Sequence, residues 1–89
     1  MPRYYFHVRD AEGLSVDFEG AEFASDEQAC NEAKQAAKEL LAERILRDEL
    51  LDGAQIEVFR ADGVLVARIP LMSVMRFKIA ITQRFDDRD

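Results

Sequence analysis

Residues 55–69 read QIEVFRADGVLVARI and carry the clearest folding signal of the chain. Two runs that alternate apolar and polar residues, many of them β-branched, flank an Asp62-Gly63 pair. Such a pair between two such runs is typical of a β-hairpin, because its tight turn needs backbone angles that glycine adopts freely. Pro70 follows and predicts the end of the second strand, since proline has no N–H to donate to a strand ladder.

A long helix is predicted upstream of this hairpin. Ser25-Asp26-Glu27-Gln28 has the spacing of a capping box, in which Ser25 accepts from the Gln28 amide and Gln28 reaches back to the Ser25 amide. Apolar residues recur at helical spacing from residue 26 to about 50, and Gly53 is the predicted glycine just beyond the helix. At ~1.5 Å per residue this helix would be ~37 Å long. A seven-residue strand covers only ~23 Å, so one end of the helix is expected to overhang the sheet.

The first part of the chain predicts another hairpin. Residues 3–9 alternate strictly, so that alternate residues share a face: Tyr4, Phe6 and Val8 on one, and Arg3, Tyr5, His7 and Arg9 on the other. A turn at residues 10–13 leads to a partner strand over 14–18. The predicted fold is therefore α+β with the order β-β-α-β-β-α, in which one long helix covers one face of a small antiparallel sheet made of two hairpins.

The C-terminal stretch over residues 71–85, LMSVMRFKIAITQRF, is apolar and basic. Its length and its place after a proline favour a helix over a strand, although alternating residues in its second half also fit a strand. A helix that is apolar on so many sides is seldom left in water. We expect it to pack on the body of the protein or on another copy, and residues 86–89 to form a frayed tail.

Length and charge narrow the functional class. The 89 residues form a single domain over 1–89, and the net charge of −6 argues against a general nucleic-acid binder. Residues 10–62 hold fifteen acidic and five basic side chains, whereas residues 63–85 hold four basic and no acidic ones. The chain is an acidic body with a basic C-terminal segment, a division that favours contact between copies or with an acidic partner.

The number of cysteines and the hydropathy of the sequence indicate the cellular compartment. A single cysteine, Cys30, excludes an intramolecular disulfide and a cysteine-cluster metal site. No apolar run approaches the ~20 residues that span a membrane, and the N-terminal sequence lacks a signal-peptide pattern. We therefore expect a cytoplasmic protein, with Cys30 buried and inert rather than activated by the start of the helix.

Catalytic and metal sites find little support in the sequence. His7 with a carboxylate from Asp10, Asp17 or Glu19 would suit general-base catalysis. A nucleophile motif, a phosphate-binding loop and a second histidine are all missing, so a structural strand histidine is the favoured interpretation. Neither a cofactor nor a metal ion is predicted, because the scattered carboxylates lack the spacing of a calcium loop.

Several of these sequence elements occur together in a known family. The opening Met1-Pro2-Arg3-Tyr4-Tyr5-Phe6-His7, the element Asp17-Phe18-Glu19-Gly20, the alanine-rich helix, Leu51-Asp52-Gly53 and Ile56-Glu57-Val58 resemble a family of short bacterial proteins catalogued as a domain of unknown function. Its members begin with a Pro-Arg-Tyr-aromatic-Phe-His strand and carry an Asp-x-Glu-Gly element. The resemblance covers about residues 1–71 and implies an α+β domain and a bacterial source, but no reaction. The chain departs from the pattern after about residue 74, where its apolar extension is longer.

The sequence thus favours a non-catalytic protein–protein interaction module that acts as a homo-oligomer, with a dimer preferred and an unknown protein as partner. The predicted interface comprises large apolar residues of the helix end and the C-terminal segment: Leu46, Leu50, Leu71, Val74, Met75, Phe77, Ile81 and Phe85. Two alternatives remain open at this point. One is a nucleic-acid-associated or antitoxin-like regulator that uses Arg76 and Lys78, and the other is an enzyme built around His7.

Overall fold

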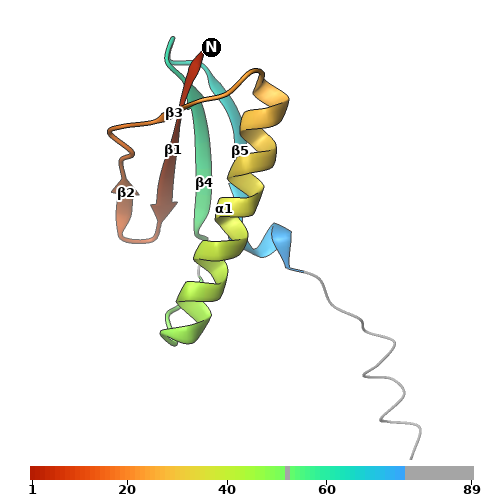
Figure 1. The fold of residues 1–89 in the computed structure, drawn as a ribbon. Coiled ribbons are helices and arrows are strands. Elements are labelled where there is room, and N and C mark those ends of the chain that lie inside the picture. The colour runs from red at the N-terminus through yellow and green to blue at the C-terminus, as the bar shows by residue number, and fades with distance from the viewer. Residues whose placement is uncertain (52, 76–89) are drawn as a thin grey trace, which may run out of the picture.

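The structure is a computed structural model that describes residues 1–51 and 53–75. Its elements follow in the order β1 (Arg3–Asp10), β2 (Gly13–Ser15), β3 (Ala21–Glu22), α1 (Asp26–Leu46), β4 (Gln55–Arg60), β5 (Leu65–Pro70) and a short 3₁₀-helix, η1 (Leu71–Val74). The strands form one antiparallel sheet, and α1 lies across one of its faces (Figure 1). The predicted α+β class with one long helix on a small antiparallel sheet is confirmed.

The sheet order is β2-β1-β4-β5, with β3 also paired to β1. The two predicted hairpins exist as β1–β2 and β4–β5, and they join where β1 runs beside β4 with Phe6 opposite Val58. The Asp62-Gly63 turn forms as predicted, with Gly63 at a φ of 89°. A register shift at Val58/Phe59 marks an irregularity between β4 and β5.

The first hairpin differs from the prediction in its second strand. β2 stops at Ser15 instead of continuing to residue 18, and the chain returns to β1 only at β3. In between, the Asp17 carboxylate accepts hydrogen bonds from the amides of Phe6 (3.1 Å), Glu19 (3.2 Å) and Gly20 (3.1 Å). A side chain therefore takes the place of a strand at the middle of the β1 edge, which is why the alternation over 14–18 did not become a strand.

α1 begins as the sequence predicts. The Gln28 amide donates to the Ser25 hydroxyl (3.1 Å), while the Gln28 side chain accepts from the amide of Ala24 (2.6 Å) rather than from that of Ser25. Asp26, in the first turn, accepts from the hydroxyl of Tyr4 (2.5 Å) and from the guanidinium of Arg60 (3.1 Å). The start of α1 is thus fixed to both central strands.

The end of α1 lies earlier than predicted. The helix stops at Leu46, and Asp48, not Gly53, holds the left-handed position beyond it with a φ of 58°. The amide of Asp48 donates to the carbonyl of Ile45 (3.1 Å) and the amide of Glu49 to that of Arg44 (2.9 Å), which is the Schellman pattern. The predicted overhang is present, since the last turns of α1 project past the ends of the strands (Figure 1).

The core lies between α1 and the sheet. Ala29, Ala33 and Ala37 are fully buried, and these small side chains let the helix backbone approach the strands closely. α1 packs mainly on β4, β5 and η1. Leu71 of η1 is fully buried and its amide donates to the carbonyl of Ala54 (3.0 Å), so η1 extends the core beyond the edge of the sheet.

The predicted helix over residues 71–85 is wrong at its start. Leu71–Val74 form a single 3₁₀ turn, and Met75 is already extended, with φ −86° and ψ 139°. The last hydrogen bond of the turn runs from the Met75 amide to the carbonyl of Met72 (3.2 Å), and Leu71 is held in the core. The rest of that segment, and residues 86–89, lie outside the described residues.

Candidate functional site

His7 lies on the face of the sheet opposite to α1, where its ring takes part in a structural contact. The amide of Asp17 donates to Nδ1 of His7 (3.0 Å), so Nδ1 carries no proton and the proton of the neutral ring sits on Nε2. The ring stands 5.4 Å from that of Phe59 and 6.3 Å from that of Tyr5, measured between centroids. The histidine therefore helps to hold the loop over residues 16–20 against β1.

The carboxylates predicted near His7 are engaged elsewhere. The Asp17 carboxylate binds three backbone amides, and that of Asp10 pairs with Arg44 (3.2 Å). Desolvation raises the pKa of Asp17, but the hydrogen bonds from Gly20, Phe6 and Glu19 lower it by more, so that its pKa lies below the ordinary value. Asp17 is thus an ionised anchor for the loop and does not orient the imidazole of His7 through its carboxylate.

The face of the sheet without the helix has a charged cluster beside its aromatic side chains. Glu57 on β4 is buried there, between Arg9 of β1 (2.8 Å) and Arg68 of β5 (3.9 Å), and Gln55 donates to the same oxygen. The hydrogen bond from Arg9 lowers the pKa of the Glu57 carboxyl below its usual range. Glu57 therefore neutralises Arg9, whereas the contact with Arg68 is longer and that guanidinium is largely exposed.

Cys30 and the acidic residues form no recognisable centre in the part of the chain that the structure describes. Cys30 is a half-buried free thiol on α1, next to the buried Ala29. No group of three or more potential metal ligands occurs among the residues of ranges 1–51 and 53–75.

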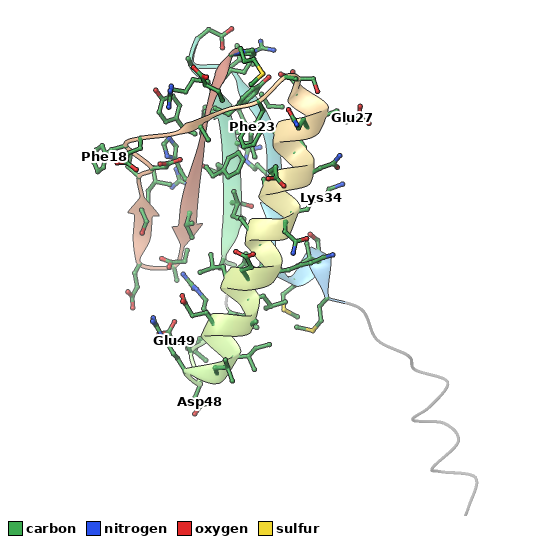
Figure 2. The ribbon with its side chains drawn as sticks, viewed as in Figure 1. Phe18, Phe23, Glu27, Lys34, Asp48 and Glu49 are labelled. Atoms are coloured by element: carbon green, nitrogen blue, oxygen red, sulfur yellow. The ribbon has the colours of Figure 1, made fainter. Side chains whose placement is uncertain are left out.

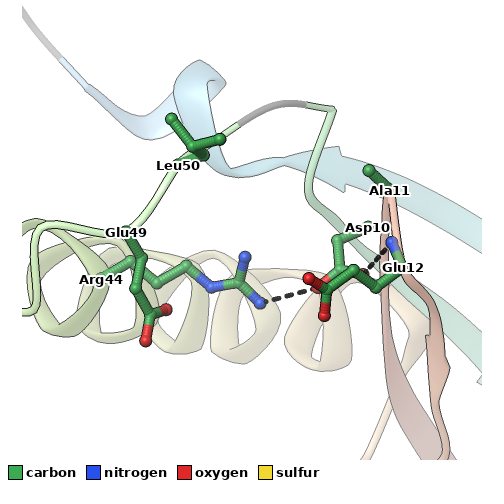
Figure 3. Close-up of a pocket in the computed structure, with 6 residues that line it drawn as sticks. All are labelled: Asp10, Ala11, Glu12, Arg44, Glu49 and Leu50. Atoms are coloured by element: carbon green, nitrogen blue, oxygen red, sulfur yellow. Dashed lines mark hydrogen bonds and ion pairs between the residues drawn. The ribbon is translucent and has the colours of Figure 1, made fainter.

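A hollow of about 480 Å³ lies between the β1–β2 turn and the end of α1 (Figure 3). Four of the six residues that line it are charged, and the ion pair between Arg44 and Asp10 spans it. The amide of Glu12 and the guanidinium of Arg44 together lower the pKa of Asp10. This hollow is therefore a place where the hairpin is tied to the helix end.

A second hollow, of about 320 Å³, lies between α1 and β1, and we call it the α1–β1 groove. Its lining combines apolar side chains of α1, β1 and β4 with two glutamates of the helix: Phe6, Val8, Ile56, Ala36, Leu40, Glu39 and Glu43. The groove exists because α1 packs mainly on β4 and β5, leaving the side chains of β1 only partly covered. It presents an apolar surface next to acidic groups.

The residues predicted to form an interface fall into three groups. Leu46 and Leu50 are exposed, at 87% and 85%, and Ile45, which the prediction did not include, is exposed beside them. Leu71 is fully buried in the chain's own core, with Val74 and Met75 packed against it. Phe77, Ile81 and Phe85 lie outside the described residues.

Sequence reasoning missed the groove and the exposed Phe18. The alternation predicts that Phe6 and Val8 share one face of the strand, and only the position of α1 across the sheet shows that part of this face is open. Phe18 was placed in a strand, whereas its side chain is 87% exposed on the loop that Asp17 holds (Figure 2). The available signal was the spacing of Glu39, Leu40 and Glu43, because Glu43 follows Glu39 by four residues and Leu40 by three and so neighbours both on the helix.

Comparisons with known proteins identify the family of the chain. No curated protein and no solved structure matches the chain. Within the described residues, no helix combines the length and the apolar character that crossing a membrane requires. A family model described as Domain of unknown function (DUF6894) matches residues 3–73, which ends close to the point where the apolar extension begins. The chain therefore belongs to the DUF6894 family.

Proposed function

We propose that this protein is a non-catalytic interaction module that associates with copies of itself. The observation that carries the proposal is the exposed apolar surface at the overhanging end of α1, formed by Ile45, Leu46 and Leu50. Scattered surface leucines are ordinary, but three large apolar side chains within six residues form a patch of the kind that marks protein interfaces.

The α1–β1 groove adds to this surface. Leu46 follows Glu43 by three residues, so it lies on the same side of the helix as the acidic edge of the groove. The apolar lining of the groove and the exposed leucine together give one elongated surface along α1. A small domain of this size gains stability when such a surface is covered by another chain.

The same structure gives less support to the two alternatives. An enzyme built around His7 would need a carboxylate or a nucleophile beside the ring, whereas Nδ1 is occupied by the amide of Asp17. A nucleic-acid regulator would need a surface rich in cationic side chains, whereas Arg9 pairs with Glu57 at 2.8 Å, and Glu39 and Glu43 border the groove. A protein surface is the better partner for an acidic, partly apolar groove.

Light scattering on a sizing column, over a range of protein concentrations, tests the proposal. We expect a dimer or higher oligomer with a 260/280 nm absorbance ratio typical of protein. Leu46→Ser combined with Leu50→Ser should shift the peak toward the monomer mass. Val64→Ser serves as a control, because Val64 is a partly exposed apolar residue at the distant β4–β5 turn. A wild-type monomer at every concentration would contradict self-association.

A further inference from the structure

We propose that the α1–β1 groove of one copy binds residues 76–85 of a second copy, in a reciprocal exchange. This inference rests on the proposed self-association and names the segment and the site that produce it. It follows from three properties: what the groove requires of its occupant, which segment of the chain meets that requirement, and where that segment leaves the body.

The lining of the groove is complementary to a segment with apolar and basic side chains. Phe6, Val8 and Leu40 provide apolar contact along its length. Glu39 and Glu43 line it, and Glu32 lies seven residues before Glu39, on the same side of α1. Glu43 also pairs with Arg47, but at 3.9 Å between largely exposed groups, a contact too weak to neutralise the edge.

Residues 76–85, RFKIAITQRF, are the segment that meets this requirement. They hold three basic side chains, no acidic one, and four large apolar side chains at Phe77, Ile79, Ile81 and Phe85. The body of the chain, over residues 10–62, carries three times as many acidic as basic side chains. Charge complementarity therefore selects this segment from the chain's own sequence.

The exposed Phe18 is a competing occupant, and its charge argues against it. Its ring has the size and exposure of an interface anchor. It is flanked by Asp17 and Glu19, however, so inserting it would bring two further carboxyl groups toward Glu39 and Glu43. Like charges across an interface are unfavourable, so Phe18 suits a basic partner surface other than this groove.

The position of η1 favours a second copy over the chain's own groove. η1 follows β5 and lies on the side of α1 away from β1, whereas the groove lies on the β1 side (Figure 1). Lys34 points to the η1 side (Figure 2), and Lys38 follows it by four residues on that side. To reach its own groove, the basic segment would have to pass these lysines and cross the helix.

A second molecule removes that obstacle. Ten residues reach at most ~33–36 Å when extended, which is ample for a groove that runs along about two turns of α1. In a two-fold symmetric pair each copy gives one segment and receives one, so the same contact is made twice. Apolar side chains of the segment and of the groove are then buried together, which stabilises the pair.

Charge reversal in the full-length chain tests this exchange. One variant combines Glu39→Lys with Glu43→Lys, and the other combines Arg76→Glu with Lys78→Glu. Each variant alone should raise the self-dissociation constant by roughly tenfold or more, since two attractive contacts per groove become repulsive. The control combines Glu12→Lys with Glu27→Lys, which raises the net charge by the same amount as the groove variant, at exposed residues outside the groove.

Mixing the two reversed variants gives the decisive result. The reversed segment of one fits the reversed groove of the other, and the remaining unaltered pair also matches. We expect the mixture to regain the wild-type mass by light scattering, while circular dichroism shows that each variant is folded.

The possible failures separate the two proposals. An oligomer that persists in both variants overturns the exchange and leaves self-association through another surface. Variants that dissociate but do not recover on mixing also overturn the reciprocal exchange. A wild-type protein that is monomeric throughout overturns both the proposed function and this inference.

Discussion

The two sides of α1 differ in how they are covered. On one side, β5 and η1 close over the helix, and Leu71 is fully buried there. On the other side, β1 leaves a groove with partly covered Phe6 and Val8. Four strands span ~14 Å between their outer axes, whereas a helix with its side chains is ~10 Å wide. One helix cannot cover this sheet, so an additional element closes one side and the other side stays open.

The largest effect is expected on the closed side. Leu71→Ala removes a fully buried side chain and should lower the free energy of unfolding by about 2–5 kcal/mol. Leu40→Ala, on the open side, removes the same atoms from a half-buried position and should cost distinctly less. Urea unfolding of both variants at a concentration where the protein is monomeric gives the comparison. Equal losses would show that the two sides are equally packed.

Gly20→Ala should give the next largest effect, at the outer edge of β1. Gly20 has a φ of 66°, and a Cβ there would lie 2.6 Å from the carbonyl oxygen of Tyr4. We expect a loss of about 1–3 kcal/mol from backbone strain and this contact.

Gly53→Ala is the matched control for that variant. Its φ of 68° is nearly the same, but a methyl group at this position would meet nothing within 4 Å, so the difference between the two variants isolates the close approach at Gly20. Equal thermal midpoints for the two variants would contradict the proposed steric contact.

Asp48→Gly should stabilise the protein, by about 0.5–1 kcal/mol, at the end of α1. The change relieves the left-handed backbone at Asp48 and removes a negative charge from the negative end of the helix dipole. Asp48→Asn removes the charge alone, so thermal unfolding of both variants separates the two causes. A destabilised glycine variant would mean that the Asp48 side chain has a role beyond the turn.

The smallest expected effect is on the pH dependence of stability, through Asp17 in the loop over residues 16–20 beside β1. The folded-state pKa of Asp17 lies below its ordinary value of 3.8, so its contribution to stability is complete above that value. The contribution is lost as the pH falls through the folded-state pKa. The gap in unfolding free energy between wild type and Asp17→Asn should therefore narrow in that acidic range. If this difference in unfolding free energy does not change with pH, the substitution acts through the geometry of the hydrogen bonds and not through the charge of Asp17.

Local signals predicted the elements that depend on neighbouring residues. The Ser25 cap, the Asp62-Gly63 turn and the alternation of β1 could each be predicted because the deciding residues are close in sequence. The end of α1 was misplaced because the left-handed position is held by Asp48, and aspartate is a weaker signal than Gly53.

The features that rest on distant residues were not predictable in this way. The Asp17 side chain replaces a strand only because Phe6 offers its amide eleven residues away. The α1–β1 groove depends on which strands α1 covers, and α1 packs mainly on β4, β5 and η1. Such properties arise from tertiary packing, which periodicity does not encode.

The divided outer edge of β1 has a consequence for aggregation. β2 and β3 cover its two ends with strands of three and two residues, and the Asp17 carboxylate occupies the amide of Phe6 between them. An incoming strand from another molecule would meet no long, flat row of free backbone groups at this edge. Sheets of neighbouring molecules are therefore discouraged from fusing at this edge into fibrils.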